Sequence, residues 1–135
     1  MFSGCRSLTG VTNMSSFGSS SPTGAIVNGT TFATDARSLL SLTLVPRFSK
    51  LDVSATAGFL SALSSLRLQN TGTGQWGGTS PQIDVSYTSL NAAALNTLFG
   101  DLTTIVSKTI NITGTPGAAT CTRSIATAKG WTVTG

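Results

Sequence analysis

A short pattern of apolar residues and threonine recurs along the chain and limits the folds that it can adopt. The shared frame is apolar-x-x-apolar-x-apolar-x-x-Thr, complete in some copies and partial in others. The copies are residues 39–44, 48–56, 63–71, 83–88, 110–115 and 131–133. An apolar-x-apolar centre predicts a strand with one buried face. Strands this short cannot bury that face alone, so we expect them to stack side by side around one core.

The threonine at the end of the frame has a predicted role of its own. Its hydroxyl can bond the backbone groups that become free where the chain turns out of a strand. Thr88 and Thr115 end two of the copies, and Thr56 and Thr71 end two others. The pattern therefore predicts strands that stop at a hydroxyl.

The copies are unevenly spaced. Leu42 and Leu51 are the middle apolar residues of two successive copies, and a step of nine residues from one to the next is too short for a full coil. We therefore expect some copies to be half-turns that place strands on different faces. The two longest spacings, from 83 to 110 and from 110 to 131, leave room for helices.

Two helices are predicted in those spacings. The first is Ser89–Leu102, with Thr88 or Ser89 as N-cap. Its apolar residues share one face: Leu90, Ala94, Leu95, Leu98, Phe99 and Leu102. The second covers residues 118–129 and stops at Gly130 in the left-handed conformation. Strand-helix-strand connections of this length predict parallel pairing by right-handed crossover.

Two segments resemble known proteins. The opening FSGCRSLTGVTNMSSF (residues 2–17) resembles the leucine-rich repeats of bacterial surface proteins. Residues 90–133, with a helix, the turn TGTPGAAT and the stop AKGW, resemble a C-terminal unit of leucine-rich-repeat regions in bacteriophage structural proteins. Residues 36–88 match only through the LxxLxL rhythm. The resemblance implies a non-enzymatic module for attachment, surface display or virion architecture.

The expected fold is an α/β repeat, rich in β structure. It is a leucine-rich-repeat-like solenoid of short parallel strands with two helices, and the C-terminal helix caps the core. The solenoid is expected over residues 36–135. Residues 1–35 are expected to be an irregular arm rich in Ser, Gly and Thr that carries a partial repeat, with 15–31 as its irregular stretch.

The residue types needed for common active sites are missing. The chain has no histidine, and its four acidic residues are all aspartates. Catalytic triads with histidine and zinc sites with histidine are excluded, and two cysteines cannot form a structural zinc centre. Cys121 is read as a small buried apolar residue. We expect no catalytic residues, no metal and no cofactor.

Asp52 and Asp84 each lie between two apolar residues of a predicted strand. If the strands stack, the two carboxylates could form an acid–base pair or a calcium site. The preferred reading is a row of charges on the outer face, Asp52–Arg67–Asp84. The asparagines of three N-x-[ST] sequons, Asn13, Asn28 and Asn111, would matter only in a glycosylating secretory pathway.

The candidate partner-binding residues are Trp76, Gln75 and Tyr87, in or near the glycine-rich segment 71–80. Exposed aromatic residues on loops often stack on sugars or proteins. The alternative for Trp76 is that the ring folds back and plugs the side of the core. Trp131, in the last copy, is expected to be a lid on the core.

Charge and hydropathy limit the classes of partner that we expect the chain to bind. The net charge is +4, but the basic residues are scattered singly, so we expect no nucleic-acid binding. We expect no signal peptide, and no apolar run of the sequence is long enough for membrane insertion. The expected function is a bacteriophage virion structural, decoration or adhesion protein that contacts capsid or tail proteins in several copies. The alternative is a module on the bacterial cell surface that binds a glycan or host protein.

Overall fold

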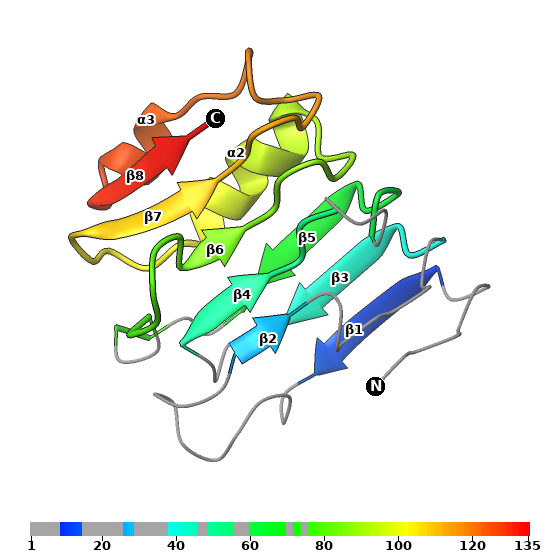
Figure 1. The fold of residues 1–135 in the computed structure, drawn as a ribbon, viewed down its shortest axis with the longest axis horizontal. Helices are drawn as coiled ribbons and strands as arrows, with labels where there is room; N and C mark the ends of the chain where they lie inside the picture. Colours follow the sequence, from blue (N-terminus) through cyan, green and yellow to red (C-terminus); the bar gives the residue numbers. More distant parts are fainter. Residues whose placement is uncertain are drawn as a thin grey trace.

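The chain folds into short parallel strands in two sheets, together with two helices (Figure 1). This is a computed structural model, and it describes residues 9–14, 26–28, 38–45, 49–55, 60–69, 72–73 and 76–135. The side chains of 11–14 and 26–28 are outside the description. The α/β class and the parallel pairing predicted from the sequence are confirmed.

The first sheet has the order β1-β3-β5 and the second the order β2-β4-β6-β7-β8. In the first sheet the strands are β1 Gly10–Met14, β3 Ser41–Leu44 and β5 Ser65–Leu68. In the second they are β2 Ile26–Asn28, β4 Lys50–Asp52, β6 Ile83–Asp84, β7 Lys108–Asn111 and β8 Trp131–Thr134. The helices are α2 Ala92–Asp101 and α3 Ser124–Thr127. All neighbouring strands pair in parallel.

Successive elements alternate between two layers. The strands β1 to β6 alternate between the first and the second sheet. From there α2, which packs on β5, and α3, which packs on α2 and β8, occupy the positions that strands of the first sheet would hold (Figure 1). Leu42 therefore lies in the first sheet and Leu51 in the second. The half-turn predicted from their close spacing is confirmed.

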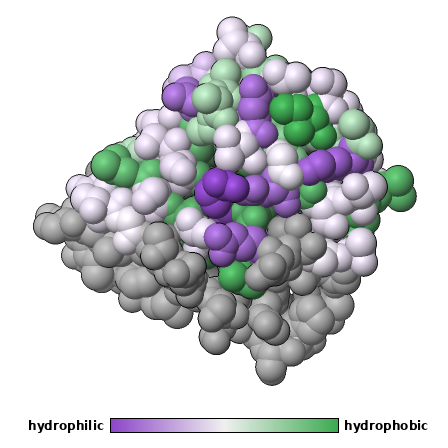
Figure 2. All heavy atoms as spheres, turned by 180° about the vertical axis from the view of Figure 1, so that it is seen from behind, coloured by the Kyte–Doolittle hydropathy of each residue, from purple (hydrophilic) through white to green (hydrophobic). Residues whose placement is uncertain are grey.

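The surface seen from behind carries mixed side chains (Figure 2). Hydrophilic residues gather near its middle, and hydrophobic residues form separate groups around them. Among the described residues, the large hydrophobic side chains that are exposed are Leu40, Tyr87 and Val106. Within the described part of the chain, no helix has the length and apolar character that crossing a membrane would need.

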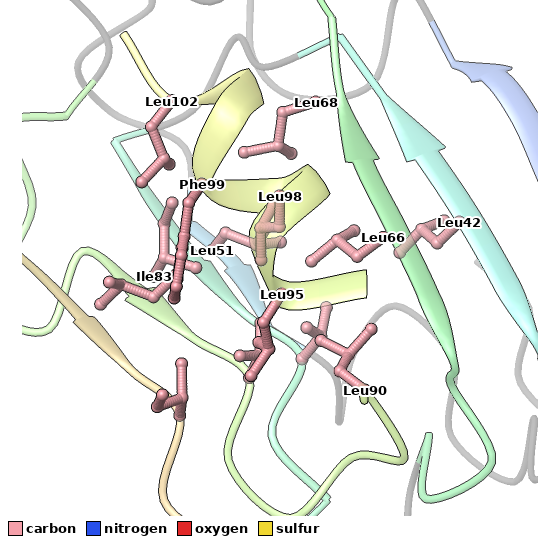
Figure 3. Close-up of a cluster of buried hydrophobic side chains, with 14 of the residues drawn as sticks. Leu42, Leu51, Leu66, Leu68, Ile83, Leu90, Leu95, Leu98, Phe99 and Leu102 are labelled. Carbon is pink, nitrogen blue, oxygen red and sulfur yellow. The ribbon is translucent and has the colours of Figure 1, made fainter. Parts of the chain in front are cut away.

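One hydrophobic core lies between the layers (Figure 3). The strand register brings the inward residues into rows. In the first sheet, Leu42 pairs with Leu66. In the second, Ile83 pairs with Leu51 on one side and with Ile110 on the other. The α2 side chains Leu95, Leu98 and Phe99 are buried against these rows. The aliphatic residues of all the predicted strands within the described chain therefore share one core, as expected.

Helix α2 starts later than predicted. Its N-cap is Asn91, whose side-chain oxygen accepts a hydrogen bond from the backbone N–H of Ala94 at 2.9 Å. Thr88 cannot serve as the cap because its hydroxyl, buried in the turn after β6, donates to the carbonyl of Val85. The N-cap predicted at Thr88 or Ser89 is therefore wrong, although the buried face of the helix is as predicted.

Helix α3 is much shorter than the predicted 118–129. The backbone N–H groups of Thr120 and Cys121 both donate to the carbonyl of Gly117, which keeps this segment in turns. Gly117 itself lies against Asn91, where an added Cβ would be 2.4 Å from the backbone carbon. Gly130 has the predicted left-handed conformation, with φ of +88°, but α3 already ends at Thr127.

The segment 1–35 contains two strands. Both β1 and β2 lie within it, and they pair with β3 and β4. The prediction of an irregular stretch at 15–31 is wrong for Ile26–Asn28, because these residues form β2 and pair in parallel with β4. The rest of 15–31 lies outside the described residues.

Candidate functional site

A row of Asp and Asn residues runs across the second sheet. Asp52, Asp84 and Asn111 each follow a buried aliphatic residue and precede another one, and all three are half-buried. Register aligns Asp84 with Asp52 on one side and Asn111 on the other. The same row continues to Asn28 in β2 and Thr134 in β8. We call Asp52, Asp84 and Asn111 the Asx row.

Each member of the Asx row closes the same local turn. Its Oδ1 atom accepts two hydrogen bonds from the Ser or Thr two residues later. The hydroxyl bonds measure 2.7 Å for Ser54 to Asp52, 2.6 Å for Ser86 to Asp84 and 2.6 Å for Thr113 to Asn111. The matching backbone N–H bonds measure 3.1, 3.0 and 3.1 Å. The row thus ends three adjacent strands in one conformation.

Two members of the row, Asn111 and Asp84, also bond to each other. The side-chain amide of Asn111 donates to both carboxylate oxygens of Asp84 at 3.3 Å. An amide beside a carboxylate supplies donors, whereas a second carboxylate would add repulsion. Among the described residues, no group of three or more His, Cys, Asp or Glu side chains could hold a metal ion.

The predicted charge row Asp52–Arg67–Asp84 is wrong. Arg67 lies on β5 in the first sheet, whereas both aspartates lie in the second. Arg67 instead forms a two-pronged ion pair with Asp101 at the end of α2, at 2.7 and 3.0 Å. Hydrogen bonding to Asp101 and its negative charge raise the pKa of the Arg67 guanidinium. Asp52 and Asp84 are register neighbours, as the carboxylate-pair reading supposed, and each closes a turn.

The predicted hydroxyl at the end of the strands is confirmed at two positions. Thr88 donates to the carbonyl of Val85 at 2.7 Å, and Thr115 donates to that of Ile112 at 2.8 Å. Both threonines are buried. The copies at Thr56 and Thr71 lie outside the described residues.

Tyr87 and Gly114 occupy the same position in successive turns. Asp84 pairs with Asn111, and Tyr87 and Gly114 each come three residues later. Both adopt the left-handed conformation, with φ of 60° and 70°. For a residue with a Cβ this conformation costs about 1 kcal/mol or more, and glycine avoids that cost. The Tyr87 side chain is 50% exposed, so this strained residue presents an aromatic ring to solvent.

Trp76 belongs to the core. It is only 1% exposed, and its ring meets that of Trp131 edge to face with centroids 5.6 Å apart. Trp131 is buried in turn, and its Nε1 donates to the carbonyl of Thr103 at 2.9 Å. The contact role considered for Trp76 does not fit a buried ring, which matches the alternative of a plug. Gln75 lies outside the described residues.

The turn between α3 and β8 is hydrogen-bonded to the end of α2. The ammonium of Lys129 donates to the carbonyls of Phe99, Gly100 and Leu102, where the helix ends. A cation at this end also favours the helix dipole. Cys121 is half-buried and packs against the core, but it precedes α3.

The Asx row could have been found in the sequence. Its signal is a Ser or Thr two residues after an Asp or Asn that lies between aliphatics, as in LDVS, IDVS and INIT. The expectations from the sequence place Asn111 in a glycosylation sequon and make Asp52 and Asp84 members of a charge row, an acid–base pair or a calcium site, and none of them includes this turn. The spacing has a structural cause, because the Asx oxygen accepts hydrogen bonds from the residue two positions later.

No protein-family model matches this chain, and neither the curated proteins nor the solved structures contain a match to it.

Proposed function

We propose that the chain is a leucine-rich-repeat-like solenoid in which each coil contributes one element to each layer. The alternation of elements between the two layers supports this proposal, as does the hydrogen bonding between equivalent residues of neighbouring coils. Ser64 bonds Leu40 across 24 residues, and Asn111 bonds Asp84 across 27. These separations are within the 20 to 29 residues of a leucine-rich repeat. In this proposal α2 and α3 take over one layer in the last coils.

We propose further that this scaffold is a structural, decoration or adhesion protein of a bacteriophage virion, acting through contacts with capsid or tail proteins. The Asx row is the observation that carries the proposal. It covers adjacent strands with short polar side chains that are already held by bonds within each turn. Side chains held in place lose little freedom when a partner docks, which favours protein contacts. The resemblance of residues 90–133 points to the virion.

The proposal is a non-enzymatic one. The chain has no histidine. Asp52 and Asp84 accept hydrogen bonds within their own turns, and Asp101 is held by Arg67 and by the backbone N–H of Leu68. These roles are structural, which supports a scaffold rather than a catalyst. The proposed partners are other virion proteins, and the chain would be present in several copies.

Purified virions test this proposal directly. Mass spectrometry should find the chain in stoichiometric amounts in particles that have been freed of host debris. Cryo-electron microscopy should then show its two parallel layers at symmetric positions on capsid or tail, at the outer surface. Virions that lack the chain would contradict the proposal, and a native mass equal to that of one chain would contradict the multi-copy assembly.

A second candidate function is recognition of a glycan or host protein, on a virion or on a bacterial cell surface. The exposed ring of Tyr87, held in a left-handed turn beside the Asx row, favours this candidate. Whole-cell labelling with an antibody against the chain distinguishes the two locations. A signal on intact bacteria without phage supports the bacterial surface, and a signal on particles alone supports the virion.

A further inference from the structure

The ring of Tyr87 is held against the backbone of the next turn. A Cβ added at Gly114 would be 2.5 Å from Cδ1 and 2.6 Å from Cε1 of Tyr87, so the ring lies directly over the Gly114 Cα. The backbone N–H of Tyr87 also donates to the carbonyl of Thr113 at 2.8 Å. One side of the ring therefore rests on glycine while half of the side chain stays exposed.

The ring is not required by the turn. The equivalent position in the following turn is Gly114, which reaches the same backbone conformation without strain. A strained residue that is kept at an exposed position suggests a role outside folding. Its surface is aromatic, rigidly placed and accessible, and such a surface suits a flat apolar ligand face.

The residues of the two turns that hold Tyr87 and Gly114 are polar and almost uncharged. Thr113, the residue before Gly114, is exposed, and its hydroxyl is bonded to Asn111. In residues 83–91 and 110–117 the one charged side chain is that of Asp84. Carboxylate, amide and hydroxyl groups next to an aromatic ring match a sugar, which has an apolar C–H face and hydroxyls at its rim.

We propose that Tyr87 is the stacking platform for a neutral pyranose ring of a glycan, with Thr113, Asn111 and Asp84 as the polar groups that orient its hydroxyls. This inference rests on the adhesion form of the proposed function and gives that form a ligand class. Because one face of the ring is already held in place, the side chain loses little conformational entropy on binding. A single ring can therefore select one face of the sugar.

Binding is tested with a panel of immobilised neutral oligosaccharides, followed by titration calorimetry with the oligosaccharide that binds best. The wild type and Tyr87→Phe should bind alike, because both keep the ring. Tyr87→Gly should weaken binding at least tenfold, although glycine suits the backbone here. The matched control is Val106→Ser, which removes another exposed side chain, 73% exposed, at the opposite ends of the strands; it should bind like the wild type.

A second readout needs no variant. Tyr87 is the one tyrosine of the chain, so ring-labelled tyrosine gives a single set of NMR signals. These signals should shift in a saturable way with the bound oligosaccharide. The proposal is overturned if no oligosaccharide binds the wild type, if Tyr87→Gly binds as tightly as the wild type, or if the ring signals stay fixed. None of these outcomes bears on whether purified virions contain the chain, so the two proposals can fail separately.

Discussion

The side-chain amide of Asn111 donates to both carboxylate oxygens of Asp84, at 3.3 Å each, across the boundary between β7 and β6. The same Asn111 accepts the hydroxyl of Thr113 at 2.6 Å. One asparagine therefore joins two strands and closes its own turn, and this double use explains why an amide follows two carboxylates along the Asx row.

Replacing Asn111 with Asp should destabilise the protein. The carboxylate would still accept from Thr113, but it would repel Asp84 and lose the two donated bonds. We expect a loss of about 1–2 kcal/mol in the free energy of unfolding in urea. The double variant Asn111→Asp with Asp84→Asn should recover most of this loss. A single variant as stable as the wild type would show that the bond between the strands contributes nothing.

Two glycines of the C-terminal half should respond oppositely to alanine. Gly117→Ala places a Cβ 2.4 Å from the backbone of Asn91, and backbone cannot easily move aside. We expect a loss of at least about 3 kcal/mol. Gly100→Ala in α2 has no atom within 4 Å of the new Cβ and should gain about 0.5–1 kcal/mol. Thermal unfolding compares the two, and equal melting temperatures would contradict the close contact at Gly117.

Lys129 should stabilise α2 from outside the helix. Lys129→Met keeps most of the side-chain length but removes the donors to the carbonyls of Phe99, Gly100 and Leu102. We expect the free energy of unfolding to fall by about 1–2 kcal/mol. The control is Lys108→Met, on a half-buried lysine at the start of β7. If both variants lose the same stability, the loss comes from removing a positive charge anywhere on the chain, and the hydrogen bonds of Lys129 to the end of α2 do not contribute.

Trp76 should behave as a core residue. Trp76→Ala would remove a ring that is 1% exposed and in edge-to-face contact with Trp131, so we expect a loss of about 3–5 kcal/mol. Tyr87→Ala, at 50% exposure, should cost far less. Urea unfolding of the two variants gives the comparison. A loss below about 1 kcal/mol for Trp76→Ala would contradict the burial of the ring in the core. Trp76 would then again be a candidate contact residue.

Much of the fold was predictable because it depends on local periodicity. The apolar-x-apolar copies around Leu42, Leu51, Leu66, Ile83, Ile110 and Trp131 are all strands. The close spacing of Leu42 and Leu51 also predicted correctly that strands fall on two faces. Such features depend on residues that are close together in the sequence, where apolar and polar residues alternate with the period of a strand.

The candidate site was less predictable because it depends on which strands become neighbours. Arg67 was assigned to the aspartates of the second sheet, but its strand lies in the first, where Asp101 of α2 reaches it. Tyr87 is predicted from the sequence as a partner-binding residue, but the placement of its ring against Gly114 of the next turn is a contact between residues distant in sequence. The fit of Gly117 against Asn91 is likewise a contact between residues distant in sequence.

The amino-acid sequence by itself determined where strands run, which of their faces is apolar and where hydroxyls end them, because these depend on residues a few positions apart. Only the tertiary structure decided that Asp52, Asp84 and Asn111 form one row, that Arg67 meets Asp101 and that Trp76 is buried. Those outcomes follow from how the strands are set in register, and the register depends on the packing of the whole core.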